Sequence, residues 1–174
     1  MWSFFYFCVM KIELRTGMHK KDAEHIAEYI RAHDNEMKKL VDLALSDDMT
    51  PSMKASWILS TASVQQKGCI NKYVDQIIEN LIDVKVSGSR RELMKALLYS
   101  DFLESEKLGK LVDTLMIFIR RTHDDLAVSY NALKLMIKIC KKFPELKPEL
   151  EETIRQNIEQ GSDTWRKLAV TTLR

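Results

Sequence analysis

Glycine and proline are scarce in this chain. Its 174 residues include 5 glycines and 3 prolines, which is under half of the roughly 12% that average usage would give for the two types. Because glycine and proline dominate turns, the sequence predicts few turns and long helices. The scattered glycines form no phosphate loop and no dinucleotide fingerprint. Apart from a weak case in residues 3–15, no run alternates with period two, so the composition argues against a sheet.

An excess of one charge is also lacking. The formal net charge is +2, so bulk electrostatic binding to nucleic acid is not indicated. The three cysteines, Cys8, Cys69 and Cys140, are odd in number and far apart. They indicate reduced thiols in a cytosolic chain rather than a disulfide framework, and we expect a cytoplasmic location.

The first ten residues, MWSFFYFCVM, are the compositional exception. The run is too short to span a bilayer as a helix. It has no basic residue before it and no A-x-A site after it, so it is a poor signal peptide. We expect residues 1–18 to be an apolar extension that packs on the first helices, or the product of an upstream start codon with Met10 or Met18 as the natural start. We expect no membrane partner.

Helical periodicity begins at His19 and continues to the end of the chain. The expected helices are 19–33, 35–46, 51–66, 69–86, 89–103, 106–121, 125–142, 148–160 and 163–174. Turn and capping residues lie between them. Thr50 is expected to cap a helix that starts at Pro51, and Ser87-Gly88-Ser89 to end one helix and cap the next. Asp124 and Ser162 are also expected as caps, with Pro144 ending a helix and Pro148 in the first turn of the next.

The apolar positions repeat every 38 residues. The shift aligns Leu59, Leu97, Leu135 and Leu173 in alternate helices, and Leu40, Ile78, Met116 and Ile154 in the helices between them. Two helices per repeat indicate a stack of helical hairpins, because one hairpin cannot bury its apolar face alone.

The first helices of the repeats carry PSMKASWILS, SRRELMKALL, LAVSYNALKL and DTWRKLAVTTL. These segments resemble HEAT first helices: a basic residue near the start, small residues one turn later, then leucine. The second half of the chain looks like small bacterial HEAT-like proteins. The resemblance covers about residues 20–174, although the first hairpin fits the register only in its second helix. It implies an all-α, right-handed superhelix. The expected single domain, 19–174, holds hairpins at about 19–46, 50–86, 89–121 and 124–160, and a last helix at 163–174.

No catalytic constellation accompanies this fold, so the sequence favours a scaffold for another protein, with no cofactor or metal, over the remaining alternative of an enzyme of unrecognised type. By analogy with HEAT-like stacks, the second helices would line the concave binding face. The candidate partner-binding residues on that face are Lys72, Gln76, Glu79, Lys110, Asp113, Glu152 and Arg155. The last helix has no following partner in the sequence, so it is expected to fold back as a cap or to form a homodimer.

The alternative function is that of a DNA-binding or DNA alkylation-repair glycosylase-like protein, because HEAT-like bacterial proteins include a family of DNA alkylation-repair glycosylases. Such a protein needs basic residues along its concave face to neutralise phosphates, whereas the second helices here are mixed to acidic. The basic pairs lie at helix ends instead. The candidate nucleic-acid contacts are Arg90, Arg91, Arg120, Arg121, Lys141 and Lys142.

The isolated reactive residues of the chain fit ordinary structural roles. His25 and His33 flank Tyr29, but a di-iron bundle needs more ligands than this one helix supplies. In THDD, residues 122–125, Asp124 reads as a helix cap rather than a metal ligand. Cys69 is expected to be a small buried hydrophobe; the alternative is a thiol whose pKa is lowered by a helix start. Trp57 is expected to pack in the core or between repeats.

Overall fold

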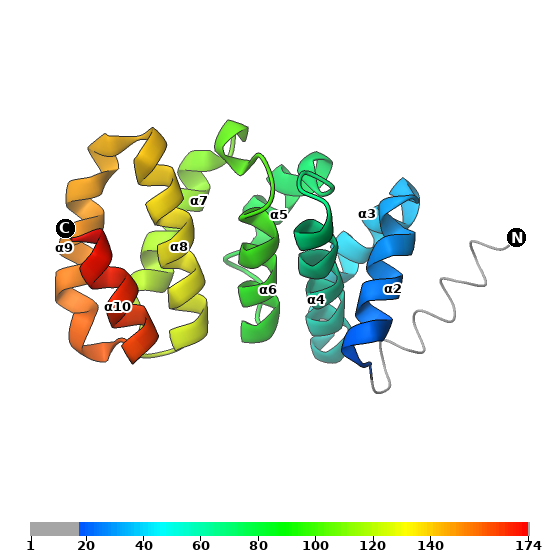
Figure 1. Ribbon diagram of the computed structural model, residues 1–174, viewed down its shortest axis with the longest axis horizontal. Helices are drawn as coiled ribbons and strands as arrows, with labels where there is room; N and C mark the ends of the chain where they lie inside the picture. The colour runs from blue at the N-terminus through cyan, green and yellow to red at the C-terminus, as the bar shows by residue number, and fades with distance from the viewer. Residues whose placement is uncertain (1–17, 174) are drawn as a thin grey trace, which may run out of the picture. The chain divides into compact units, whose positions relative to one another are not determined.

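The computed structural model describes residues 18–173, and within that range the chain is all-α (Figure 1). Nine α-helices and no strand occur in this range. They are α2 (Lys20–Arg31), α3 (Asp34–Ala44), α4 (Met49–Gln65), α5 (Val74–Asn80), α6 (Ser87–Leu97), α7 (Leu108–Arg120), α8 (Leu126–Lys142), α9 (Lys147–Asn157) and α10 (Asp163–Thr172). The predicted all-α fold class is confirmed. The expectations for residues 1–17 and for Arg174 fall outside the described residues.

The chain divides into two compact units, the first ending at Ser105 and the second beginning at Glu106. Helices α2 to α6 belong to the first unit and α7 to α10 to the second. The expected single repeat domain over residues 19–174 stays a prediction, and each unit is described by itself below.

Helix α4 is the centre of the first unit. It packs against α2, α3 and α6, so it must offer small or apolar side chains on several sides. Its sequence does so, with Ala55, Ile58, Leu59 and Ala62 fully buried. Helix α4 packs most extensively against α6. Buried serines lie at this contact, and their small side chains allow the two helices to pack closely. The Ser52 hydroxyl donates to the Ala44 carbonyl at 2.8 Å and lies 2.9 Å from the Ser89 hydroxyl.

In the second unit, α7 packs against α8 and α9, and α8 packs against α10. The largest buried side chain is that of Trp165, in the first turn of α10. Its indole N–H donates to the Ser129 hydroxyl at 3.0 Å, which joins α10 to α8. A Cβ atom at Gly161 would lie 2.5 Å from the Trp165 ring. Only glycine therefore fits at the turn before α10.

Side-chain contacts between neighbouring repeats confirm the 38-residue period. Lys72 bonds Asp34, and Lys85 bonds Asp47, and in both pairs the two residues are 38 positions apart. In the second unit, His123 bonds Gln160, which lies 37 positions further along the chain. Equivalent positions of successive repeats thus lie side by side, as a stack of helical hairpins requires.

Two helices are much shorter than the periodicity predicts. The expected helix 69–86 is a 3-10 turn at Asn71–Tyr73 followed by the short α5, and the expected helix 89–103 ends at Leu97. Apolar spacing misleads at these ends because buried residues continue beyond the helices: Ile70, Leu81 and Phe102 are fully buried in turns or 3-10 segments. Beyond the ends of α5 and α6, the apolar spacing therefore indicates that residues are buried, not that they are helical.

Several predicted helix starts are also corrected. Helix α4 starts at Met49 after Asp48, so Thr50 is not its cap and Pro51 is its third residue. Helix α6 already begins at Ser87, so Ser87-Gly88-Ser89 is its first turn rather than a break. The carboxylate that caps α8 belongs to Asp125, not Asp124. The Ser162 cap is confirmed, as are the helix end before Pro144 and Pro148 in the first turn of α9.

Candidate interaction surfaces

In the first unit, two of the predicted partner-binding residues bond to the neighbouring second helix. Lys72 contacts the Asp34 carboxylate at 2.6 Å, and Gln76 donates to Asp42 at 2.7 Å. The Lys72 ammonium lowers the pKa of Asp34 below its ordinary value of 3.8, and Lys38, 2.8 Å from Asp42, lowers the pKa of Asp42 in the same way. The Lys72–Asp34 and Gln76–Asp42 bonds hold α3 against α5 and the 3-10 turn that precedes it. They leave Lys72 largely exposed, with 71% of its side-chain surface accessible.

The other predicted partner-binding residues differ in exposure. Glu79 is half-buried on α5. In the second unit, Lys110 is half-buried and Asp113 is exposed on α7, while Glu152 and Arg155 are exposed on α9. The α9 side chains contact their own helix: Arg155 lies 3.2 Å from Glu151, and Glu152 accepts from Gln156 at 2.8 Å. The seven residues therefore divide between the two units, three in the first and four in the second.

A pocket of about 290 Å³ opens beside α7 in the second unit. Its lining residues are Leu108, Gly109, Val112 and Asp113 from α7, and Phe143, Glu145 and Leu146 from the segment before α9. The walls are mostly apolar, and the carboxylates of Asp113 and Glu145 are exposed at its edge. A Cβ atom at Gly109 would meet nothing within 4 Å, so this glycine leaves open space on the pocket wall. Asp113 is the predicted partner-binding residue that the structure places beside a pocket.

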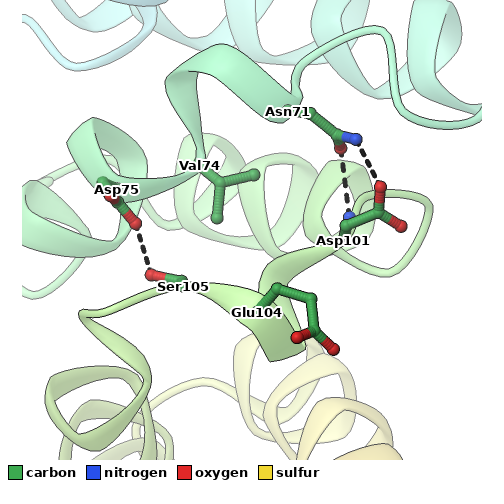
Figure 2. A pocket seen from close by; sticks show the side chains of 6 residues that line it. All are labelled: Asn71, Val74, Asp75, Asp101, Glu104 and Ser105. Atoms are coloured by element: carbon green, nitrogen blue, oxygen red, sulfur yellow. Dashed lines mark hydrogen bonds between the residues drawn. The ribbon is translucent and has the colours of Figure 1, made fainter.

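An acidic pocket of about 210 Å³ lies in the first unit, at the start of α5 (Figure 2). Asp75, Asp101 and Glu104 line it together with Asn71, Val74 and Ser105. Figure 2 shows that its polar groups bond to one another. The Asn71 amide donates to the Asp101 carboxylate at 2.5 Å and accepts from its backbone N–H, and Ser105 donates to Asp75. These bonds join the loop before α5 to the loop after α6, so the pocket has a structural role.

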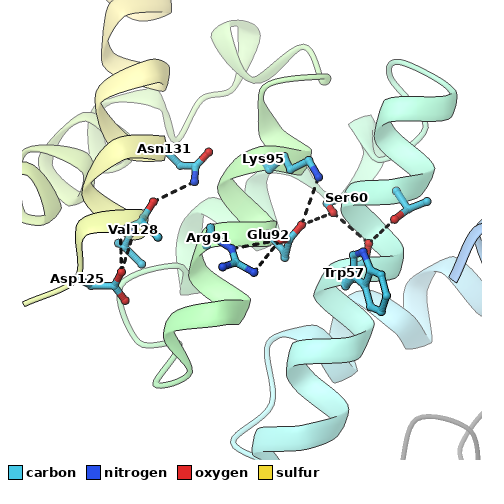
Figure 3. Close-up of polar contacts among 10 residues, drawn as sticks. Trp57, Ser60, Arg91, Glu92, Lys95, Asp125, Val128 and Asn131 are labelled. Atoms are coloured by element: carbon cyan, nitrogen blue, oxygen red, sulfur yellow. Dashed lines mark hydrogen bonds and ion pairs between the residues drawn. The ribbon is translucent and has the colours of Figure 1, made fainter. Parts of the chain in front are cut away.

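A third pocket lies between α4 and α6 and includes Trp57 (Figure 3). It measures about 150 Å³ and is lined by Met53, Lys54 and Trp57 from α4, and by Arg91 and Glu92 from α6. Trp57 is half-buried, so it is neither a full core residue nor fully exposed. The prediction was packing in the core or between repeats; Trp57 is not fully in the core, and its place between α4 and α6 agrees with packing between repeats.

Glu92 forms the polar floor of this pocket and is only 8% exposed. One carboxylate oxygen lies 3.1 Å from the Arg91 guanidinium. The other accepts from the Ser60 hydroxyl at 2.5 Å and lies 3.7 Å from the Lys95 ammonium (Figure 3). Because a buried carboxylate needs compensation by hydrogen bonds or positive charge, these contacts explain why Glu92 is tolerated at the junction of α4 and α6.

The basic pairs predicted for nucleic-acid binding do not form one ridge within either unit. Arg90 and Arg91 lie at the start of α6, in the first unit. In the second unit, Arg120 and Arg121 are at the end of α7, and Lys141 and Lys142 are at the end of α8. Helices α7 and α8 form a hairpin (Figure 1), so these two pairs lie at its opposite ends. Arg91 and Arg120 also pair with the carboxylates of Glu92 and Glu149.

Neither described cysteine is activated. Burial raises the pKa of the Cys69 thiol above 9.0, although Ser63 and Arg31 act in the opposite direction. Burial likewise raises the pKa of Cys140. The alternative in which a helix start lowers the pKa of Cys69 is thus wrong, because desolvation is the largest effect there.

Histidines and carboxylates are not gathered into a metal site within residues 18–173, where no group of three or more suitable ligands converges. The His33 ring stacks on Tyr29 with 4.0 Å between ring centroids. His123 lies 3.0 Å from Asp124 at the surface, which is the contact that Asp124 makes instead of capping α8.

None of the helices within residues 18–173 is long and apolar enough to cross a membrane.

Paired helices with a 38-residue period and bonds between equivalent positions define an α-helical repeat protein. The chain belongs to the HEAT repeat domain family, whose model matches residues 10–168. HEAT repeat domains generally act as scaffolds for protein interaction. No curated protein and no solved structure matches the chain.

Proposed function

We propose that this chain is a non-catalytic scaffold that binds another protein through the side of the molecule formed by its second helices. The observation that carries the proposal is the pocket beside α7, where an open apolar wall meets exposed carboxylates. Partner recognition by repeat proteins uses such surfaces, because successive repeats present side chains from a rigid stack.

The pocket favours a protein segment with an apolar side chain next to a basic residue. Leu108, Val112 and Phe143 supply apolar contact for one inserted side chain. Asp113 and Glu145 supply negative charge at the edge, so a lysine or arginine beside the anchor would complement them. The volume, about 290 Å³, is at the lower end of the roughly 300–1,000 Å³ typical of small-molecule sites.

Selection of random displayed peptides on the immobilised protein tests the proposal. We expect the enriched peptides to pair an apolar residue with a lysine or arginine. Gly109→Phe should fill the pocket and weaken their binding by roughly tenfold or more, a loss typical of an interface hot spot. Gly109→Ala is the matched control: it leaves most of the pocket open and removes the conformational cost of a glycine in a helix.

Binding that is unchanged in both Gly109→Phe and Asp113→Lys would exclude the pocket as the binding site. Selection of no peptide at all would count against the scaffold function itself.

The cytoplasmic location and a homodimer through α10 are further parts of the proposal. The latter is checked by sedimentation at several protein concentrations, where a strict monomer removes it.

DNA binding is kept as the alternative function, and its residues remain Arg90, Arg91, Arg120, Arg121, Lys141 and Lys142. It predicts a mobility shift of duplex DNA that weakens steeply as salt is raised. The absence of a shift at low salt would end this alternative.

A further inference from the structure

Helix α4 presents an apolar stripe to solvent, which is unusual for the central helix of a unit. Met49, Met53 and Val64 are 69%, 43% and 46% exposed, and the half-buried Trp57 lies between them. At about 100° per residue these four positions fall within an arc of roughly 80°, so they share one side of the helix. The stripe is roughly 22 Å long, at 1.5 Å per residue.

Three of the five large hydrophobic residues that are exposed within the described chain lie on this stripe. Met49, Met53 and Trp57 follow one another at every fourth position, whereas Val64 lies beyond the buried Ser60. Scattered exposed hydrophobics need no explanation, but neighbouring ones on one helix face commonly mark an interaction site. The pocket between α4 and α6 opens at the middle of the stripe, because Met53 and Trp57 form one of its walls.

The charged residues within α4 and α6, the two helices that line the pocket, are mostly basic. Helix α4 contains one charged residue, Lys54. Helix α6 contains three basic residues, Arg90, Arg91 and Lys95, and one acidic residue, Glu92. The carboxylate of Glu92 is buried and bonded to Ser60, and it is paired with Arg91 and Lys95. The ammonium and guanidinium groups remain at the surface, since Arg91 and Lys95 keep 47% and 42% of their side-chain area exposed.

The size of the pocket restricts what can enter it. At about 150 Å³ it is well below the roughly 300–1,000 Å³ of a cofactor or small-molecule site. It has room for one side chain, anchored on the Trp57 ring and the Met53 thioether. Tryptophan, methionine and arginine are also the residues enriched in the cores of protein–protein interfaces.

We propose that the α4–α6 surface, defined by Met49, Met53, Trp57, Val64, Arg91 and Lys95, is a second docking site that takes an acidic protein segment with an aromatic or aliphatic anchor. The anchor enters the pocket beside Trp57. Its acidic neighbours pair with Lys54, Arg91 and Lys95. This site uses first helices, so it is separate from the pocket beside α7 and opposite to it in charge preference.

A protein segment fits this surface better than nucleic acid does. Nucleic-acid interfaces are more polar and much more positively charged than protein interfaces. Here Met49, Met53 and Trp57 present apolar side chains at the centre of the surface, and two of its basic side chains share the Glu92 carboxylate.

The test uses the full chain and labelled peptides in fluorescence anisotropy. The probe is an amphipathic peptide of about 15 residues, long enough to follow α4 as a helix, with a phenylalanine anchor and glutamates beside it. A charge-reversed peptide with lysines and a labelled oligothymidylate are the competing probes. We expect the acidic peptide to bind and the lysine peptide to bind at least about tenfold more weakly, since mismatched charge at an interface is costly. The oligothymidylate should also bind more weakly than the acidic peptide, because it shares the negative charge but has no apolar side chain to enter the pocket.

Three variants locate the binding. Trp57→Ala removes the anchor wall, and Met53→Glu puts a negative charge at the pocket without changing a buried residue. Each variant should weaken the binding of the acidic peptide by roughly tenfold or more, as truncation of an interface anchor does. Lys38→Glu on α3 is the control for added negative charge outside the site, with a larger charge change than Met53→Glu. It should change the affinity by less than about twofold, because it breaks only an exposed ion pair.

The proposal is overturned if the acidic peptide does not bind, or if Trp57→Ala and Met53→Glu leave its affinity unchanged. Preferential binding of oligothymidylate that both variants abolish would overturn it in favour of nucleic acid. Binding of the acidic peptide only after removal of residues 1–17 would identify that segment as the occupant of the surface. Self-association lost in Met53→Glu would identify a second copy of the chain.

Discussion

Trp57 illustrates what a repeat can and cannot specify at a single residue. The 38-residue shift places Lys95, Leu133 and Thr171 at the positions equivalent to Trp57. Lys95 is half-buried, Leu133 is buried and Thr171 is exposed. The repeat predicts the helix on which Trp57 lies, because the flanking leucines recur. It does not predict exposure, since that depends on which neighbouring side chain covers the position in each repeat. The pocket beside Trp57 could therefore not be derived from the sequence.

The buried serines of α4 differ in a way that only coordinates reveal. Ser52, Ser56, Ser60 and Ser63 all have no accessible surface. The hydroxyls of Ser52, Ser60 and Ser63 bond to Ala44, Glu92 and Leu59. The Ser56 hydroxyl has no hydrogen-bond partner among the described residues. An unsatisfied buried polar group is destabilising, whereas a bonded one is close to neutral or favourable.

Opposite effects are expected for alanine at two of these serines. Ser56→Ala should raise the free energy of unfolding by about 1 kcal/mol, because it removes a buried hydroxyl that bonds nothing. Ser52→Ala should lower it by about 1–2 kcal/mol, because the Ala44 carbonyl and the Ser89 hydroxyl lose their partner. Urea unfolding followed by circular dichroism measures both. Equal destabilisation by the two variants would contradict the assignment of Ser56.

At the scale of helices, the sequence locates the elements better than their ends. All the expected helices from residue 19 onward have a counterpart, because apolar periodicity reports which face is buried. The ends depend on which of several neighbouring polar residues bonds the free N–H groups of the first turn. In HDD, residues 123–125, the sequence offers two adjacent carboxylates, and only the backbone geometry decides between them.

The cap of α8 gives a direct comparison. The Asp125 carboxylate accepts from the backbone N–H groups of Ala127 and Val128 at 3.1 and 3.0 Å. Asp125→Ala should therefore lower the free energy of unfolding by about 1 kcal/mol, as loss of an N-cap usually does. Asp124→Ala is the adjacent control and should change it by less than about 0.5 kcal/mol, as for most surface substitutions. A larger effect at Asp124 would restore the sequence-based assignment.

At the scale of the whole molecule, one periodicity predicted the class of fold and the resemblance of the first helices indicated the family, but neither predicted the surfaces. The 38-residue shift predicts which helices are equivalent, and hence that Asp34 and Lys72 occupy matching places. It carries no information on which exposed residues face a partner. Of the predicted partner-binding residues, Lys72 and Gln76 bond to a neighbouring helix, while Asp113 lies beside a pocket.

The lowered pKa values of two carboxyl groups on α3 predict how stability depends on pH. The pKa values of Asp34 and Asp42 are lowered from 3.8 by Lys72 and Lys38. A carboxyl with a depressed pKa in the folded state stabilises the fold above its unfolded pKa, and this contribution is lost as pH falls through the folded value. The urea midpoint should therefore fall as pH drops below about 4.

In the double variant Asp34→Asn, Asp42→Asn, this acid-induced fall should be smaller than in the unaltered chain. Asp83→Asn, an exposed position outside these pairs, is the control and should keep the original pH profile. Identical profiles for the double variant and the unaltered chain would show that the two carboxylates do not contribute to acid sensitivity.

The bonds between adjacent repeats also bear on how the chain is made. The bonds of Lys72 to Asp34 and of Lys85 to Asp47 each join residues 38 positions apart. Contacts of such short range require little loop closure, which favours rapid folding. At synthesis rates of about 5–20 residues per second, the 38 residues of one repeat emerge within roughly 2–8 seconds. Each hairpin can thus dock on its predecessor while the next is still being translated, so the first unit does not need the finished chain to begin folding.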